Sequence, residues 1–203
     1  MTYSRGNVAG VIFFIAVVQF ILCLTIAGAL YPGYSISNNY ISDLGVGPSA
    51  IVFNASVFLL GLLTLVGTYR LRQYPNFKTV NILLFLMAIM AMGVGIFTKD
   101  STLAHGAVSS AAFFFAGLSA ITSFKVLMSP LSVISLILGA ITLVALGLFS
   151  SGMIESGSLT SDIAYDSSFY LGLGPGGMER MIIYPVLMWL AGFGVYIVTK
   201  REI

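Results

Sequence analysis

The sequence predicts an all-α integral membrane protein, a single bundle of six transmembrane helices formed by residues 1–203. Two observations lead to this prediction. The composition is 58% hydrophobic and only 8% charged, whereas an ordinary soluble domain is about 25% charged. In addition, the chain contains six apolar stretches, each close to the roughly 20 residues that a helix needs to cross a bilayer. Short connections use nearly all of the remaining chain, so no separate soluble domain is expected.

The six predicted spans are separated by polar segments rich in glycine, proline or charged residues. Two of the spans follow a proline, Pro48 or Pro130, and proline is well tolerated at the start of a helix. Small residues recur in the third, fourth and sixth spans, and we expect them to let helices pack closely. The predicted spans are 8–30, 49–69, 79–97, 103–124, 131–151 and 178–199.

The basic residues predict the orientation of the bundle. If the amino terminus is cytoplasmic, the cytoplasmic segments hold all of the 9 Lys and Arg residues except Lys99 and Arg180. Such an excess of basic residues is typical of the cytoplasmic side. Both termini are then cytoplasmic, the long loops 31–48 and 152–177 are on the outer face, and a multi-pass protein of the plasma membrane is expected. The acidic residues on that outer face are Asp43, Asp100, Glu155, Asp162, Asp166 and Glu179.

Polar side chains gather at the outer ends of the predicted spans. Such groups are costly at membrane depth, so each of them is a functional candidate. Asn54 is also suited to hydrogen bonding between helices. We expect one polar pocket on the outer face, lined by the candidate ligand-binding residues Asp43, Asn54, Asp100, His105, Glu179, Arg180 and Tyr184.

Several of these residues have a structural alternative that the sequence leaves open. Arg180 either forms an ion pair with Glu179, Asp43 or Asp100, or its planar guanidinium binds an anionic headgroup. Asp43 also fits the role of a cap on a short helix in the outer loop. His105 fits a hydrogen-bonded structural histidine as well as a ligand.

The candidates for catalysis are His105 and Asp100. Ser109 lies one helical turn after His105, but no nucleophile-elbow sequence surrounds it. A zinc site would need His105 together with carboxylates such as Asp43 and Glu179. No metal-ligand spacing supports such a site, so neither a metal nor another cofactor is predicted.

Three functions are compatible with these features. The favoured hypothesis is a non-enzymatic membrane protein whose outer polar pocket binds a lipid headgroup or a polar segment of a protein partner. The second is a membrane-embedded enzyme that acts on a lipid at the outer leaflet, with His105 as acid or base. The third is an accessory subunit of a larger membrane complex. Membrane lipids and other membrane subunits are the expected partners, because a net charge of +2 is too small to imply nucleic acid.

Three motifs carry a resemblance to a known family: ISDLG at Ile41–Gly45, GVGIFTKD and LAHGAVSS within 93–110, and GGMERMIIYPVLMW at 176–189. The pattern resembles domain-of-unknown-function family 998, uncharacterised multi-pass membrane proteins of archaea and bacteria. In that family the turn before the histidine is often Pro-Glu-Asp-like, whereas Thr98 and Lys99 hold its first two positions here. The resemblance implies a membrane location and this architecture, without an established reaction. More distantly, the layout is similar to Frag1/DRAM-type six-helix proteins.

Overall fold

The computed structural model describes residues 5–156 and 167–200. This part of the chain contains six long helices and no strand, which confirms the all-α prediction. All six helices are long and apolar enough to cross a membrane, so the chain has the architecture of a multi-pass membrane protein. The helices are α1 (Arg5–Leu30), α2 (Ala50–Leu71), α3 (Lys78–Ile96), α4 (Thr102–Thr122), α5 (Leu131–Glu155) and α6 (Gly174–Thr199).

The predicted loop 152–177 is wrong at both ends, because two helices extend beyond their apolar stretches. Helix α5 continues to Glu155, and α6 already begins at Gly174. Proline at the first turn of α6 needs no hydrogen-bond partner for its nitrogen there. The predicted outer residues Asp162 and Asp166 lie outside the described residues.

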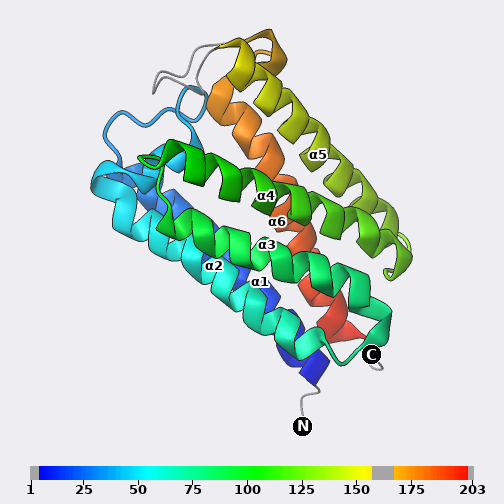
Figure 1. The fold of residues 1–203 in the computed structure, drawn as a ribbon. Helices are drawn as coiled ribbons and strands as arrows, with labels where there is room; N and C mark the ends of the chain where they lie inside the picture. The colour runs from blue at the N-terminus through cyan, green and yellow to red at the C-terminus, as the bar shows by residue number, and fades with distance from the viewer. Residues whose placement is uncertain (1–4, 157–166, 201–203) are drawn as a thin grey trace.

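The helices form a closed ring in which each packs against the next in sequence and α6 returns to α1 (Figure 1). Helix α1 begins, and α6 ends, at the same end of the bundle (Figure 1). Of the most apolar stretch of α6, 61% is buried, compared with 28–39% for the other five spans. Helix α6 is therefore the innermost element of the bundle.

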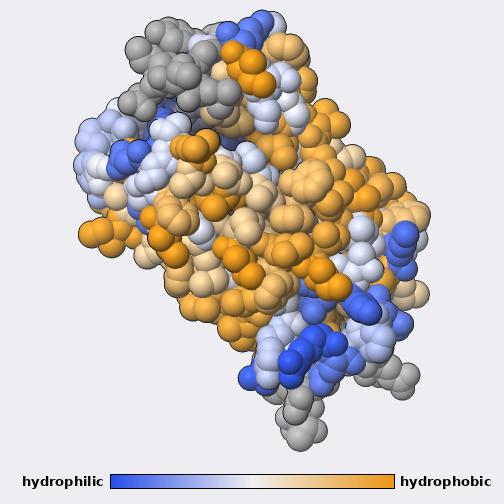
Figure 2. Space-filling model, in the orientation of Figure 1, coloured by the Kyte–Doolittle hydropathy of each residue, from blue (hydrophilic) through white to orange (hydrophobic). Residues whose placement is uncertain are grey.

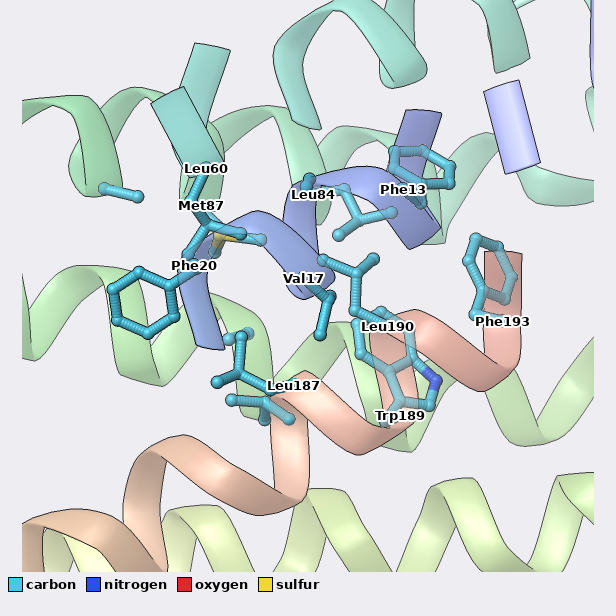
Figure 3. Packing of buried hydrophobic residues seen from close by; sticks show 14 of the residues in the cluster. Phe13, Val17, Phe20, Leu60, Leu84, Met87, Leu187, Trp189, Leu190 and Phe193 are labelled. Atoms are coloured by element: carbon cyan, nitrogen blue, oxygen red, sulfur yellow. The ribbon is translucent and has the colours of Figure 1, made fainter. Parts of the chain in front are cut away.

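The bundle core is built from aromatic and aliphatic side chains that α1, α2, α3 and α6 point toward one another (Figure 3). Trp189 stacks on Phe193 with ring centroids 5.4 Å apart, and Phe13 lies 5.9 Å from Phe193. Large apolar side chains also cover the outside of the bundle, where they form an apolar band between two hydrophilic ends (Figure 2). This surface suits contact with lipid tails rather than with water.

Glycines allow several helix pairs to approach closely. A Cβ atom added at Gly61 of α2 would lie 2.6 Å from the carbonyl oxygen of Ala88 in α3. A Cβ atom at Gly194 would lie 2.6 Å from the carbonyl oxygen of Gly10 in α1. Because both neighbours are backbone atoms, a side chain at either position would push two helices apart.

We predict that Gly61→Val lowers the free energy of unfolding by about 1–3 kcal/mol, the usual cost of overpacking a buried contact. Thermal unfolding of the purified protein in detergent measures this effect. Gly192→Val is the matched control, because no atom lies within 4 Å of a Cβ atom added there. Equal melting temperatures for the two variants would contradict the packing argument.

The two ends of the bundle differ in charge. One end, which we call the basic end, carries Arg70, Arg72, Lys78, Lys125 and Lys200. The opposite end carries the loop 31–49, which we call the lid. The positive-inside rule predicts that the basic end is cytoplasmic.

This orientation is testable with cysteines placed at Asn38 in the lid and at Asn76 at the basic end, both of which are exposed. In a Cys23→Ala background, we expect a membrane-impermeant maleimide to label Asn38→Cys in intact cells. Asn76→Cys should react only after the cells are lysed. The reverse pattern would invert the predicted orientation.

Candidate functional site

The lid is a folded segment with two short 3₁₀ helices, η1 (Ile41–Gly45) and η2 (Gly47–Ser49). Asp43 caps η1, because its Oδ2 accepts the backbone N–H of Tyr40 at 2.9 Å. Asn54 of α2 donates from Nδ2 to the carbonyl oxygen of Gly45 at 2.8 Å. Asn54 therefore fastens the lid to α2. Within residues 5–156 and 167–200 its side chain does not bond to a neighbouring long helix, although the sequence suggested such a bond.

The lid rests directly on the first turns of α6. The backbone N–H of Gly176 donates to the carbonyl oxygen of Ser37 at 2.8 Å. A Cβ atom at Gly176 would lie 2.0 Å from the carbonyl oxygen of Asn39, so this contact requires glycine. Glu179, which is only 6% exposed, accepts the backbone N–H of Ile41. The lid and the start of α6 are thus one packed unit.

Arg180 lies buried beneath the lid with 8% of its surface exposed. Its Nη1 donates to the carbonyl oxygens of Ile36 at 2.7 Å and Gly176 at 2.8 Å, and its Nη2 donates to the hydroxyl of Tyr34 at 2.6 Å. Burial raises the pKa of the Tyr34 phenol, and the adjacent Arg180 cation opposes that rise. The guanidinium is therefore held by neutral oxygen atoms.

No carboxylate pairs with Arg180 among the described residues, where the one ion pair joins Lys99 to Asp43. The suggested pairing of Arg180 with a carboxylate is therefore wrong for this part of the chain. Asp43 is occupied by Lys99 and by the cap of η1, and Glu179 is occupied by the lid backbone. Lys99 was the residue that the sequence reasoning missed. Lys99 could have been recognised in the sequence, because it is one of only two basic residues predicted on the outer side.

The predicted residues do not meet in one pocket, because the structure distributes six of them over three spaces, and Asn54 lines none of the three. A bowl of about 370 Å³ on the lid surface is lined by Asp43, Lys99 and Asp100 among others. A cavity of about 90 Å³ inside the bundle has His105 and Glu179 in its wall. A groove of about 610 Å³ is lined by α1, the lid and α6 and includes Tyr34, Arg180 and Tyr184.

The described side chains around the internal cavity do not form an activated serine nucleophile. His105 Nδ1 lies 2.8 Å from the carbonyl oxygen of Phe97, and Nδ1 carries the proton because a carbonyl can only accept. The Ser109 hydroxyl donates to the backbone carbonyl oxygen of His105 at 2.7 Å, so it does not donate to the imidazole. Asp100 is exposed and lines the surface bowl. The described residues therefore give no serine–histidine–acid arrangement.

The candidate metal ligands are not gathered either. No group of three or more His, Cys, Asp or Glu residues in the described ranges 5–156 and 167–200 could hold a metal ion. The suggested set of His105, Asp43 and Glu179 is separated because Asp43 lines the bowl, whereas His105 and Glu179 line the internal cavity.

The groove beside Arg180 combines one polar end with a long apolar wall. Arg180 and Tyr34 mark the lid end, and Tyr184 lies one helical turn deeper with 38% of its surface exposed. The wall away from the lid consists mainly of apolar side chains of α1 and α6, including Leu24 and Met188. The groove therefore has one end with a buried cation and a mainly apolar remainder.

The family model described as "Protein of unknown function (DUF998)" matches residues 14–196, which contain the lid and most of every helix. The chain belongs to this family. No curated protein and no solved structure matches the chain. A similarity to the Frag1/DRAM-type proteins is not among these findings. The family therefore supports the membrane architecture, and the function has to be argued from the geometry.

We predict that Asp43→Ala lowers the free energy of unfolding by about 1–3 kcal/mol, because it leaves the buried Tyr40 N–H without its acceptor. Lys99→Ala removes a partly exposed ion pair and a contact of the ammonium with the Tyr40 ring, 4.7 Å from its centre, but it leaves the Tyr40 N–H bonded to Asp43. It should therefore cost less, about 0–1 kcal/mol. Thermal unfolding in detergent compares the two variants. If Lys99→Ala were the more damaging change, the cap on η1 would not be the main role of Asp43.

Proposed function

We propose that this protein binds an anionic phospholipid in the cell membrane, with the phosphate at Arg180 and an acyl chain in the groove between α1 and α6. The observation that carries the proposal is the state of Arg180. Its guanidinium is buried, has no carboxylate partner among the described residues, and borders an open groove. A binding role without catalysis agrees with the lack of an assembled nucleophile in the described residues.

The electrostatics favour an anion. A buried charge is costly unless hydrogen bonds and an opposite charge compensate it. The bonds to Ile36, Gly176 and Tyr34 come from neutral oxygen atoms. Glu179 lies close enough to interact electrostatically with Arg180, but its carboxylate bonds to the lid backbone and forms no ion pair with the guanidinium. Within the described residues, Nε of Arg180 donates to no acceptor. A phosphate presents several oxygen atoms to the planar guanidinium, which is the pairing that arginine forms best.

The groove favours a lipid over a soluble anion. Its volume of about 610 Å³ lies within the range of about 300–1,000 Å³ that is typical of ligand pockets. A small soluble anion would use only the lid end, whereas an acyl chain also covers the apolar wall. In such a complex Tyr184 would lie at the boundary between headgroups and tails, where tyrosine is common in membrane proteins.

The decisive experiment fills the groove without touching Arg180. A Cβ atom at Gly28 would lie 3.7 Å from the Tyr34 ring, an ordinary contact, so the ring of Gly28→Phe enters the groove. Gly147→Phe on α5 is the matched control, because no atom lies within 4 Å of a Cβ atom there. We expect native mass spectrometry to show that Gly28→Phe loses a bound anionic phospholipid that the control retains.

A second variant addresses the charge. Arg180→Gln keeps a donor for the lid carbonyls but removes the cation, and we expect phosphatidylglycerol binding to weaken by about 1.5–3 kcal/mol, the usual worth of a hydrogen bond to a charged group. The melting temperature of each variant shows whether the bundle stays folded. Equal lipid retention by Gly28→Phe and Gly147→Phe would overturn the proposal.

A further inference from the structure

A second lateral groove lies at the basic end of the bundle, far from the lid. It has a volume of about 460 Å³ and is formed by α2 and α3. Arg72 and Tyr69 are at its basic end, and the apolar side chains of Leu65, Ile82 and Phe85 form its wall. We propose that this groove binds a second anionic phospholipid, in the leaflet on the side of the basic end.

The charge at this groove is available to a ligand. Arg72 is exposed, and no carboxylate among residues 5–156 and 167–200 pairs with it. Its guanidinium carbon lies 4.0 Å from the centre of the Tyr69 ring, and its Nη2 donates to the Tyr69 hydroxyl at 3.1 Å. Stacking on tyrosine fixes the arginine at the groove while its other donors stay free for a phosphate. Arg70 and Lys78 at the same end add to the local positive potential, which attracts anionic lipids.

Asn81 supplies the second, independent observation. It lies in the first turn of α3 and lines the groove. Its side-chain Oδ1 is buried and has no hydrogen-bond partner among the described residues. An amide without a partner inside a transmembrane helix is costly. Rotation of the amide by 180° exchanges Oδ1 and Nδ2 and would place the Nδ2 donor at this buried position. A ligand that presents a hydrogen-bond acceptor there would then remove part of that cost.

The depths of the two residues match the order of groups in a phospholipid. Arg72 follows directly after the end of α2, and Asn81 lies three residues inside α3, or about 4.5 Å along the helix axis. A phospholipid likewise has its phosphate at the surface and its ester carbonyls deeper. Because an ester carbonyl only accepts hydrogen bonds, Nδ2 of Asn81 is the group that would donate to it. The acyl chains then cover Leu65, Ile82 and Phe85.

The experiment measures retention of phosphatidylglycerol and phosphatidylcholine by native mass spectrometry of the full chain. We expect Arg72→Gln to weaken phosphatidylglycerol binding about fivefold, the effect of one basic residue near an anionic lipid, and phosphatidylcholine binding less. Asn81→Leu should weaken both lipids about threefold, the effect of one hydrogen bond, because both lipids contain the ester. Arg70→Gln and Asn76→Leu are the controls, since neither residue lines the groove.

Each outcome decides the proposal. A selective loss in Arg72→Gln and Asn81→Leu, with both controls unchanged, supports a defined site. An equal loss in Arg72→Gln and Arg70→Gln means only diffuse attraction between a basic surface and anionic lipid, and overturns it. The result is separate from that at the lid end, because Gly28→Phe blocks a groove of α1 and α6 and leaves this groove open.

Discussion

The lid end of the bundle depends on one constraint, the accommodation of the Arg180 cation in the second turn of a membrane helix. Such a cation is tolerated only where acceptors converge on it. The carbonyl oxygens of Ile36 and Gly176 and the hydroxyl of Tyr34 provide them. To supply these groups, the lid must cross α6 so closely that Gly176 can carry no side chain. The path of the lid, and hence the position of Asp43, follows from this requirement.

The same helix geometry explains why Glu179 and Arg180 do not pair. Successive residues of an α-helix are rotated by about 100°, so neighbours in sequence do not face each other. Glu179 lines the internal cavity and bonds to the lid backbone, whereas Arg180 lines the groove with α1. Two opposite charges that are adjacent in the sequence therefore serve two separate spaces.

The sequence was sufficient for the six helices because the length of each apolar stretch matches the membrane. It was insufficient for the helix ends, because two helices continue through less apolar residues. Helix α5 ends only at Glu155, and α6 already begins at Gly174. The depth of the polar residues was also predictable, but their partners were not. The pairing of Lys99 with Asp43 depends on the path of the lid, which no periodicity in the sequence reveals.

The two proposed lipid grooves share a pattern, an arginine beside a tyrosine at the aqueous end and an apolar wall beyond it. They differ in burial, because Arg180 is only 8% exposed whereas Arg72 belongs to the exposed residues. Salt screens exposed charges strongly and buried ones much less. A phosphate at Arg180 would therefore be held in a fixed geometry and resist salt, whereas a phosphate at Arg72 would exchange and weaken as salt rises. The proposed site at the lid would therefore bind its lipid more durably than the proposed site at the basic end.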